Sequence, residues 1–218
     1  MKLEEIKDCI DSSDPQDRMR AITELRHYEP ELAVPLLKKR VQDQELIIRS
    51  FAIMGLGVKR TDEAFELLLN IIQQDDDPNI RAEAANSLGS YGARAIPHLV
   101  ELFRNESHWL VRQSIYAVIN LSQHPDLLLE LAIIGLQSND LVVKQVSVSN
   151  LAQLADTPEA AKALELLLPA AKSKQTEVRI QAARALAQFD NSQARAALEE
   201  LRDDADHRVI GATLEKLL

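Results

Sequence analysis

The sequence is poor in cysteine, aromatic residues and glycine, and these shortages narrow the kinds of structure that it can form. Cys9 is the one cysteine among 218 residues, so an internal disulfide and a Cys-x-x-Cys metal pair are both excluded. Aromatic residues make up only 4% of the chain, with a single tryptophan. This composition suits helices that pack through leucine, isoleucine and alanine rather than a globular aromatic core.

Long apolar runs and a surplus of basic residues are also lacking. No stretch approaches the roughly 18 uncharged apolar residues that a membrane span needs. The formal net charge is −9, whereas binding to a phosphate backbone needs clustered Lys and Arg, so we expect no nucleic-acid partner. The first residues are amphipathic and acidic, unlike a secretory peptide. Together with the single cysteine, this start indicates the reducing cytoplasm.

The motifs of metal and nucleotide chemistry are missing too. The five histidines form no His-Glu-x-x-His pattern, and no Gly-Lys-Ser/Thr phosphate loop occurs. Residues 55–57 lack the strand and the third glycine of a dinucleotide loop. Residues 75–77 lack the alternating ligands of a calcium loop, and we interpret them as a turn with a helix cap at Asp77. We therefore expect no catalytic residue, no metal site and no resident cofactor.

A repeat of about 32 residues, marked by a recurring basic residue, is the main feature that the sequence does contain. In most repeats, small or apolar residues stand one place before this residue and three, four and seven places after it, and Glu215 breaks the series in the last repeat. These positions share one face of an α-helix, so each repeat is predicted to contain an amphipathic helix. The basic positions are Arg18, Arg49, Arg81, Arg112, Lys144, Arg179 and Arg208.

The residue four places before each basic position is predicted to begin the helix. A side-chain oxygen there can accept a free backbone N–H and favours the positive end of the helix dipole. His108 replaces the acid in one repeat, and we expect its ring nitrogen to act as the cap. The predicted caps are Asp14, Glu45, Asp77, His108, Asp140, Gln175 and Asp204.

A second apolar helix precedes each of these helices, and no period-2 alternation suggests strands. The sequence therefore predicts an all-α fold, a right-handed α-solenoid (superhelix) of about seven helix pairs, with the first helix at about residues 3–10. Because each pair packs only on its neighbours, we expect one domain over residues 1–218. The expected units span about residues 1–28, 29–59, 60–91, 92–123, 124–155, 156–189 and 190–218.

Residues 77–99 read Asp-Pro-Asn-Ile-Arg-Ala-Glu-Ala-Ala-Asn-Ser-Leu-Gly-Ser-Tyr-Gly-Ala-Arg-Ala-Ile-Pro-His-Leu. This segment resembles the HEAT-like repeat of the phycobilisome lyase type, and the resemblance covers almost the whole chain. Residues 105–110, Asn-Glu-Ser-His-Trp-Leu, together with the helix expected after them, resemble the small cyanobacterial HEAT proteins implicated in phycobilisome degradation. The resemblance implies that the partner is a phycobiliprotein or the machinery that assembles or degrades it.

Features that the repeats share are interpreted as packing. Each recurring basic residue is expected to bond a cap acid or a helix-end carbonyl in a neighbouring unit, which forms a ladder. A direct role of these residues in ligand binding is the alternative. Tyr28, Tyr91 and Phe189 all stand ten places after a basic residue and are interpreted as core residues between neighbouring units.

The fourth repeat differs most from the others. It has His108 and Trp109 where two other repeats have Asp-Pro, and it has Tyr116 where the others have a small or aliphatic residue. Trp109, Arg112 and Tyr116 share one side of the predicted helix. Aromatic residues combined with arginine are typical of binding hot spots. The alternative is that Trp109 and Tyr116 fill a gap between neighbouring units.

The second helix of each pair is expected to line the concave side of the solenoid. Its outward positions are small and rich in amides, and Phe51 and Met54 stand out there as apolar residues facing away from the predicted core. We predict a polar trough that accepts a partner helix, with Phe51 and Met54 holding one end. A solvated face that is partly buried by curvature is the alternative.

The sequence thus favours a non-catalytic adaptor that binds a protein on its concave face. The first alternative is a bilin lyase or bilin-detaching chaperone, with phycocyanobilin as a transient ligand held by His108, Trp109 and Arg112. The second is a stabiliser of another cytosolic complex. The apolar end at Leu217 and Leu218 is expected to pack on a second copy. The residues predicted to bind the partner are Phe51, Met54, Asn86, Trp109, Arg112, Gln113 and Tyr116.

Overall fold

Helices dominate the computed structural model, which describes residues 1–119 and 124–215. No β-strand occurs in these two ranges, so the predicted all-α class is confirmed. The first helices of the pairs are α1 (Leu3–Ile10), α3 (Pro30–Lys38), α5 (Asp62–Gln74), α7 (Ile96–Asn105), α9 (Pro125–Leu136), α11 (Ala160–Ala170) and α13 (Ser192–Leu201). The second helices are α2 (Pro15–Glu24), α4 (Leu46–Lys59), α6 (Pro78–Gly89), α8 (Trp109–Val118), α10 (Leu141–Asn150), α12 (Thr176–Leu186) and α14 (His207–Leu214). Short 3-10 helices among the described residues are η1 (Leu25–His27), η2 (Gly92–Arg94) and η4 (Leu151–Leu154).

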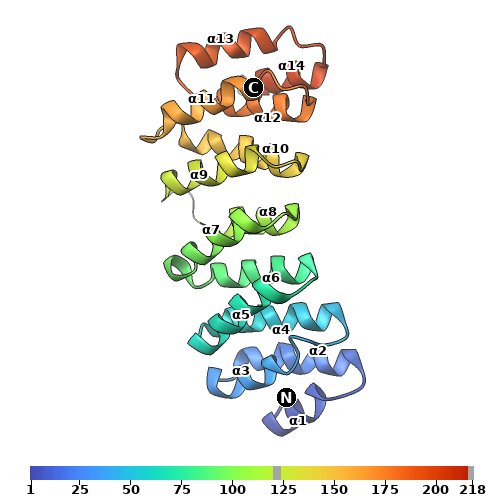
Figure 1. The fold of residues 1–218 in the computed structure, drawn as a ribbon. Helices are drawn as coiled ribbons and strands as arrows, with labels where there is room; N and C mark the ends of the chain where they lie inside the picture. Colours follow the sequence, from blue (N-terminus) through green and yellow to red (C-terminus); the bar gives the residue numbers. More distant parts are fainter. Residues whose placement is uncertain (120–123, 216–218) are drawn as a thin grey trace. The chain divides into compact units, whose positions relative to one another are not determined.

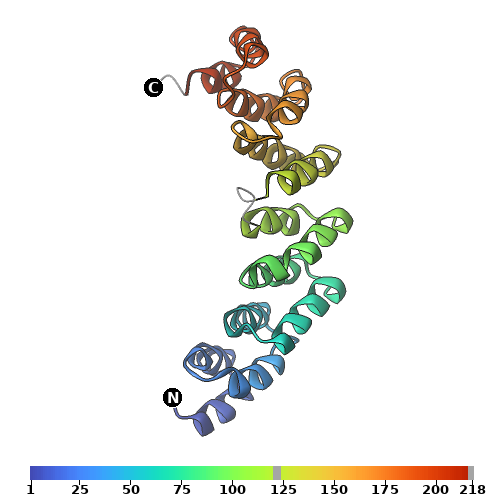
Figure 2. The same cartoon turned by 90° about the vertical axis from the view of Figure 1, so that its left-hand side faces the viewer.

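The helix pairs stack within two compact units, Met1–Ile119 and Asn120–Leu218, here called the N-terminal unit and the C-terminal unit. In the N-terminal unit, α2, α4, α6 and α8 pack side by side as one layer, and α1, α3, α5 and α7 each pack on their partner helix (Figures 1 and 2). In the C-terminal unit, α10, α12 and α14 form one layer and α9, α11 and α13 the other. Paired helices stacked in two layers are the α-solenoid architecture that the repeat predicts.

Side-chain caps begin most of the second helices, as predicted. His108 accepts the backbone N–H of Leu110 on its Nδ1 at 3.3 Å, which confirms that an imidazole replaces the acid there. Glu45 and Gln175 stand at the predicted cap positions, but their side chains make no capping bond. An aspartate accepts the N–H two residues later, at 2.8 Å, at Asp14, Asp77 and Asp140.

The prediction for the last helix pair is wrong by two residues. We expected Asp204 to cap the final helix, with Arg208 at the recurring basic position. Asp206 is the cap instead and accepts the Arg208 N–H at 2.9 Å, so Ile210 takes the basic position. We aligned the last repeat on the charged side chain of Arg208. The position of the helix depends instead on its cap and on the face that it buries. The shift also explains why Glu215 interrupts the expected apolar pattern.

A hydrogen bond that the sequence prediction missed fixes the loop before each of the described second helices. The residue two places before the cap accepts the backbone N–H of the cap residue, which makes a compact local turn. The sequence signal was present, because this position holds an acid or a serine in every repeat. The acceptors are Ser12, Asp43, Asp75, Glu106, Ser138, Ser173 and Asp204.

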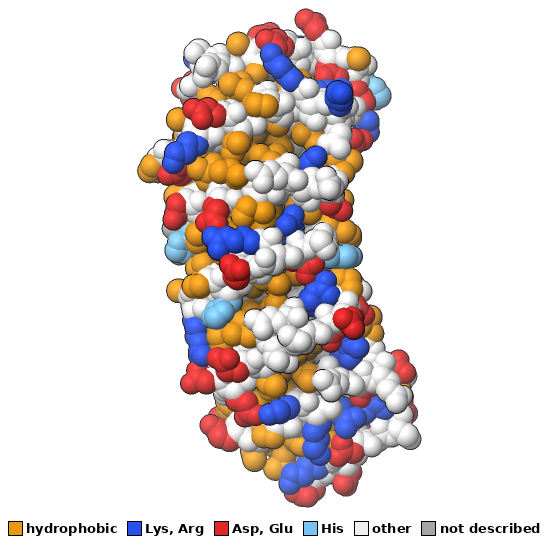
Figure 3. Space-filling model, viewed as in Figure 1, with side chains coloured by type: hydrophobic (Ala, Val, Ile, Leu, Met, Phe, Trp, Pro, Cys, Tyr) orange, Lys and Arg blue, Asp and Glu red, His pale blue; other side chains and the backbone are white. Residues whose placement is uncertain are grey.

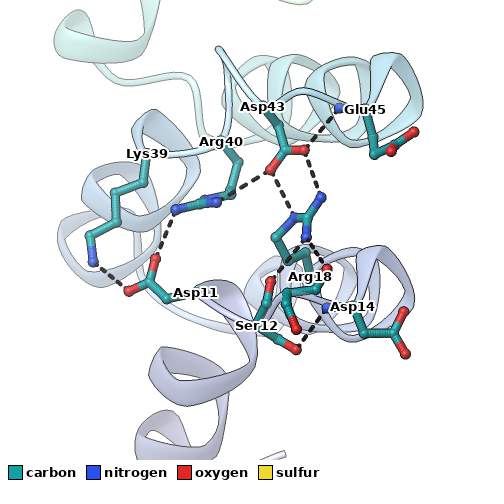
Figure 4. Close-up of polar contacts among 9 residues, drawn as sticks. Asp11, Ser12, Asp14, Arg18, Lys39, Arg40, Asp43 and Glu45 are labelled. Carbon is teal, nitrogen blue, oxygen red and sulfur yellow. Dashed lines mark hydrogen bonds and ion pairs between the residues drawn. The ribbon is translucent and has the colours of Figure 1, made fainter.

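The same acceptors anchor the predicted ladder of basic residues. Arg18 donates from Nη2 to Oδ1 of Asp43 at 2.8 Å and from Nη1 to the carbonyl of Ser12 at 2.9 Å, which joins one helix pair to the next (Figure 4). Ion pairs of the same kind join Arg49 to Asp75, Arg81 to Glu106 and Arg179 to Asp204. The ladder between neighbouring pairs is thus confirmed at these positions, but its closest acid is the residue two places before the cap and not the cap acid that we expected.

Ion pairing outweighs burial at the ladder carboxylates. Burial disfavours the charged form of Asp43, but hydrogen bonds from the Arg18 side chain and the Glu45 N–H hold its pKa below the ordinary value. Glu106 is also buried, and the Arg81 guanidinium together with the His108 N–H lowers its pKa in the same way. These carboxylates therefore stay ionised where an isolated buried acid would not.

The ladder is interrupted where a serine replaces the acid. Ser138 and Ser173 occupy the acceptor position in two repeats, and a hydroxyl cannot form an ion pair. Among the described residues, neither Arg112 nor Lys144 has a carboxylate within ion-pair distance. Arg112 instead donates its Nε–H to the carbonyl of Phe103 at 3.2 Å, with its guanidinium 5.0 Å from the centroid of the Phe103 ring. This carbonyl belongs to α7, the partner of α8 in the same pair, whereas the ladder hypothesis expected a carbonyl of a neighbouring unit.

Glycines let the helices of the second layer approach closely. A Cβ added to Gly89 in α6 would lie 2.4 Å from the Cβ of Val118 in α8. A Cβ on Gly57 in α4 would lie 2.8 Å from the Cβ of Ser87 in α6. Both distances are shorter than packed carbon atoms adopt, so only glycine fits without displacement. Gly92 has another role, since its φ of 60° belongs to the left-handed region that favours glycine.

The aromatic residues ten places after the basic positions are confirmed as packing residues to different degrees. Phe189 is buried, with 7% exposure, whereas Tyr28 and Tyr91 are half-buried. The Tyr91 hydroxyl lies 3.3 Å from the carbonyl oxygens of Leu56 and Thr61. Burial raises the pKa of Tyr91 to about 12, so the phenol stays a neutral donor to the preceding helix pair.

Candidate functional site

An apolar ridge lies on the exposed side of α4 in the N-terminal unit. Met54 is 45% exposed and Val58 is 61% exposed, and the two residues stand one helical turn apart. Neither is needed to complete the core, because Ile53 and Leu56 fill the buried side of the same helix. Adjacent exposed apolar residues that the core does not need are typical of an interaction surface.

One side of this ridge, toward α2 and η1, is hollowed by a first groove of about 220 Å³. Sites for drug-sized ligands usually span about 300–1,000 Å³, so this groove better fits one or two side chains of a partner. Phe51 is partly buried in its wall and does not project from the surface. The apolar lining consists of Ile22, Leu25, Leu37, Phe51, Met54 and Val58.

The other side of the ridge, toward α6, carries a second groove of about 500 Å³. This groove is more polar, because Asn86, Ser90, Glu83 and Arg60 contribute to its lining. The Ser90 hydroxyl donates to the carbonyl of Gly57 at 2.6 Å, which holds that side chain in place. The two grooves share Met54 and Val58, so the ridge separates an apolar groove from one with a larger share of polar side chains.

Glu83 is a half-buried carboxylate in the second groove. No cation lies within ion-pair distance of it among the residues that the structure describes. Burial raises the pKa of Glu83 because the charged form loses solvation without gaining a partner. An unpaired acid in a groove influences which charge a bound partner can place nearby.

The trough residues predicted from the sequence come together in part. Met54 and Asn86 are exposed and line the second groove, and Phe51 lies in the first groove on the same helix. Gln113 is exposed on α8, in the same layer of helices. The structure therefore places these residues on one layer, while their role in binding remains a prediction.

Arg112 and Tyr116 do not form the exposed stripe that the helical spacing suggested. Arg112 is 9% exposed and Tyr116 is 7% exposed, and Tyr116 packs edge-on against Phe103 with 4.9 Å between ring centroids. The spacing correctly placed both residues on one side of the helix, but that side faces the core. The alternative, that Tyr116 fills a packing gap, agrees with its burial.

Trp109 lies apart from the two grooves. It is the first residue of α8, is 38% exposed, and stacks on the His108 ring with centroids 6.0 Å apart. Neither groove is lined by Trp109 or His108. The three residues predicted to hold a bilin are therefore an exposed indole, a capping imidazole and a buried guanidinium.

Sequence reasoning missed three residues of the grooves. Val58 stands nine places after Arg49, at an outward position, but valine was not singled out as unusual there. Glu83 occupies the outward position two places after Arg81, and its burial depends on the neighbouring helix. Arg60 ends α4 in a left-handed conformation that no sequence pattern signals for an arginine.

Basic, acidic and apolar side chains are interspersed on the face of the N-terminal unit drawn in Figure 3. Within residues 1–119 and 124–215, no helix is both long and apolar enough to cross a bilayer. The predicted self-association through Leu217 and Leu218 falls outside the described residues.

A sequence model of HEAT repeats matches residues 42–120 and 129–217. A search among curated proteins gave no match. Among solved structures, the Escherichia coli protein YibA aligns with a TM-score of 0.63 at 18% identity, over 100% of this chain and 84% of that one. The CpcE–CpcF complex of phycocyanin lyase from Nostoc sp. PCC7120 aligns with a TM-score of 0.50 at 20% identity, over 100% and 95%. Human deoxyhypusine hydroxylase aligns with a TM-score of 0.46 at 19% identity, over 99% and 94%.

Proposed function

The chain belongs to the HEAT repeat proteins, and on that premise we propose that it is a non-catalytic adaptor that binds a partner protein through the α4 ridge and its two grooves. The layer of second helices provides the extended surface that α-solenoids use for recognition. The observation that carries the proposal is the pair Met54 and Val58, exposed between two hollows on a helix whose core side is complete without them.

The proposed binding energy comes from apolar burial at the ridge, with polar groups fixing the position of the partner. Fully burying an exposed aliphatic side chain contributes about 1.5–3 kcal/mol, and Met54 and Val58, at 45% and 61% exposure, can each contribute about half of that. The grooves on both sides allow partner side chains to pack against the ridge rather than only on top of it. The ladder ion pairs join the neighbouring helix pairs to one another. The binding surface is therefore already ordered, and binding loses little conformational entropy.

The test is the double variant Met54→Asp with Val58→Asp. Two charges on the ridge should abolish the cross-linking of this chain to partner proteins in native cytosol. The helix content measured by circular dichroism should stay unchanged. The matched control is Leu32→Asp with Ile133→Asp, since these residues are 46% and 40% exposed but lie outside both grooves. Phe51 is left intact because its partial burial would confuse loss of binding with loss of fold. Capture of the same proteins by the ridge variant would overturn the proposal.

We further propose a phycobiliprotein, or its assembly or degradation machinery, as the partner in the cytoplasm. The support is the repeat resemblance of residues 77–99 and 105–110. The likeness to phycocyanin lyase, at 20% identity, is a likeness of fold and adds no partner by itself. Co-elution with purified phycocyanin that is lost in the ridge variant would support this partner. Capture of unrelated cytosolic proteins would favour the stabiliser of another complex.

The bilin lyase or chaperone alternative has one specific observation in its favour. Trp109 is exposed and stacked on His108, so an aromatic surface is available to a flat ligand. Arg112, the residue expected to hold propionates, is buried against Phe103. Absorbance of the protein with free phycocyanobilin tests this function. A red-shifted band that disappears in Trp109→Ala supports it, and an unchanged spectrum rejects it.

A further inference from the structure

We propose that the two grooves beside α4 receive an amphipathic helix of a partner protein that carries carboxylates beside its apolar side chains. The proposal rests on the proposed function and names the chemistry of the partner.

Cations without carboxylate partners lie at the two grooves. Arg26 and Lys59 line the first groove, and Arg20 stands one helical turn before Thr23 of its lining. Arg60, at the end of α4, lines the second groove. Among the described residues, none of these four cations has a carboxylate within ion-pair distance, whereas most arginines elsewhere are paired. The chain carries a net charge of −9, so a cationic rim around an apolar groove runs against its overall charge.

Two acids act electrostatically on Arg26 and Lys59 but form no ion pair with them. Glu24 accepts a hydrogen bond from the N-terminal amine at 2.7 Å and forms its ion pair there. Glu29 acts on Lys59 only at longer range. The Lys59 ammonium is held by backbone carbonyls instead, with Nζ 3.1 Å from the carbonyl oxygen of Arg26. A carboxylate from outside would therefore complete the local charge balance.

Arg60 adds an independent observation. Its φ is 51°, in the left-handed region, where a residue other than glycine is strained. Glycine would end α4 at this place without that strain. The Arg60 side chain lines the second groove. A strained arginine at a groove is consistent with selection for its charge rather than for stability.

The spacing of the grooves favours a helix as the occupant. The grooves lie on the two sides of α4, so their separation is set by the packing distance of adjacent helices, about 8–10 Å. Side chains seven residues apart on a helix stand about 10 Å apart along its axis. A partner helix that crosses α4 can thus place one apolar side chain in the first groove and a polar one, seven residues later, in the second. Met54 and Val58 then pack between them.

Glu83 sets the polarity of that arrangement. It lines the second groove together with Arg60, whereas Arg26 and Lys59 line the first groove, whose lining contains no acid. Carboxylates of the bound helix therefore belong near Arg20 and Arg26, and an amide or hydroxyl belongs near Glu83 and Asn86. Replacing Glu83 by glutamine should tighten binding of an acidic helix and weaken binding of a basic one.

The test uses two synthetic 18-residue helical peptides that differ only in charge. The acidic probe carries leucines at positions i, i+3, i+4 and i+7 with glutamates flanking them, and the basic probe has lysines in place of the glutamates. Fluorescence anisotropy with the full chain should show tighter binding of the acidic probe, weakening as salt rises. Arg20→Glu with Arg26→Glu should weaken this binding by about tenfold or more. Glu83→Gln should tighten it.

A matched control separates the local effect from net charge. Lys172→Glu with Lys174→Glu changes the charge of the chain by the same amount on exposed residues of the C-terminal unit and should leave the acidic probe bound. Equal binding of the two peptides, or undiminished binding by the Arg20 and Arg26 variant, would overturn the proposal. So would tighter binding of the basic probe, or binding of phosphatidylserine vesicles in place of the peptide.

Failure here is distinguishable from failure of the proposed function. If neither peptide binds while the Met54 and Val58 variant still loses its captured proteins, the ridge remains an interface and only the acidic-helix chemistry is wrong. If the Met54 and Val58 variant retains its captured proteins, the interface itself is misplaced.

Discussion

At the scale of single residues, the buried environment rather than the residue type decides which side chains can bind. Trp109, Arg112 and Tyr116 look alike as hot-spot residues in the sequence, yet only Trp109 is exposed. The environment also decides the direction in which the pKa of a carboxylate shifts. Asp43 has a lowered pKa because its bonds to Arg18 and the Glu45 N–H outweigh burial, whereas burial without a partner raises the pKa of Glu83.

Arg60 offers a prediction at this scale. Arg60→Gly should raise the free energy of unfolding by about 1 kcal/mol, because it removes a Cβ from a left-handed conformation. Thermal melting followed by circular dichroism measures the change. Arg60→Ala is the control, since it removes the charge but keeps the Cβ and should not stabilise the chain. A similar gain in both variants would show that charge, not backbone strain, is the cause.

At the scale of the helix, repeating units are joined by two devices. One is the ladder, in which an arginine of one pair bonds the loop acid of the next. The other is close packing of the second helices, at Gly57 and Gly89, where a Cβ would collide with the neighbouring helix. Both devices join a helix to the adjacent pair, so each contact is local to two repeats, as expected for a solenoid.

Gly89→Ala tests the packing device. The added Cβ would meet Val118 at 2.4 Å, so we expect a loss of about 1–3 kcal/mol of stability from overpacking. Gly211→Ala is the matched control, because nothing lies within 4 Å of that position and alanine favours a helix by about 1 kcal/mol. Chemical denaturation of the two variants should show shifts of opposite sign. Two shifts in the same direction would contradict the close approach of α6 and α8.

At the scale of the whole molecule, ladder carboxylates connect stability to pH. Asp43, Glu106 and Asp204 have lowered pKa values in the folded chain, with Arg18, Arg81 and Arg179 as their respective partners. Groups with a lowered folded pKa stabilise the fold above their unfolded pKa, near about 4, and lose that contribution as pH falls through the folded value. Both units contain such a pair, so acid should weaken both.

The melting temperature should therefore stay nearly constant between pH 8 and about pH 5 and fall steeply below about pH 4.

Asp43→Asn should lower stability at neutral pH by about 3–5 kcal/mol, since it leaves the buried Arg18 charge without its partner. The same variant should flatten the acid dependence. Asp62→Asn, at an exposed ion pair with Arg94, is the control and should change stability by less than about 1 kcal/mol. Equal effects of the two substitutions would contradict the ladder argument.

The sequence alone determined the repeat, the helix pairs and the ladder, because all three depend on spacing along a helix. A basic residue about every 32 positions and a cap four places earlier were enough to place α1 at residues 3–10 and to identify His108 as a cap. The same reasoning misplaced the last repeat by two residues, because it followed Arg208 rather than the buried face.

Tertiary structure decided which residues form a surface. Exposure depends on what the neighbouring helix covers, and one helix sequence does not contain that information. Packing of α8 turned Arg112 and Tyr116 inward, while the spaces beside α4 left Met54 and Val58 exposed between two grooves. The meeting of two unpaired cations at an apolar groove follows from the same packing, because it brings Lys59 of α4 beside Arg26 of η1.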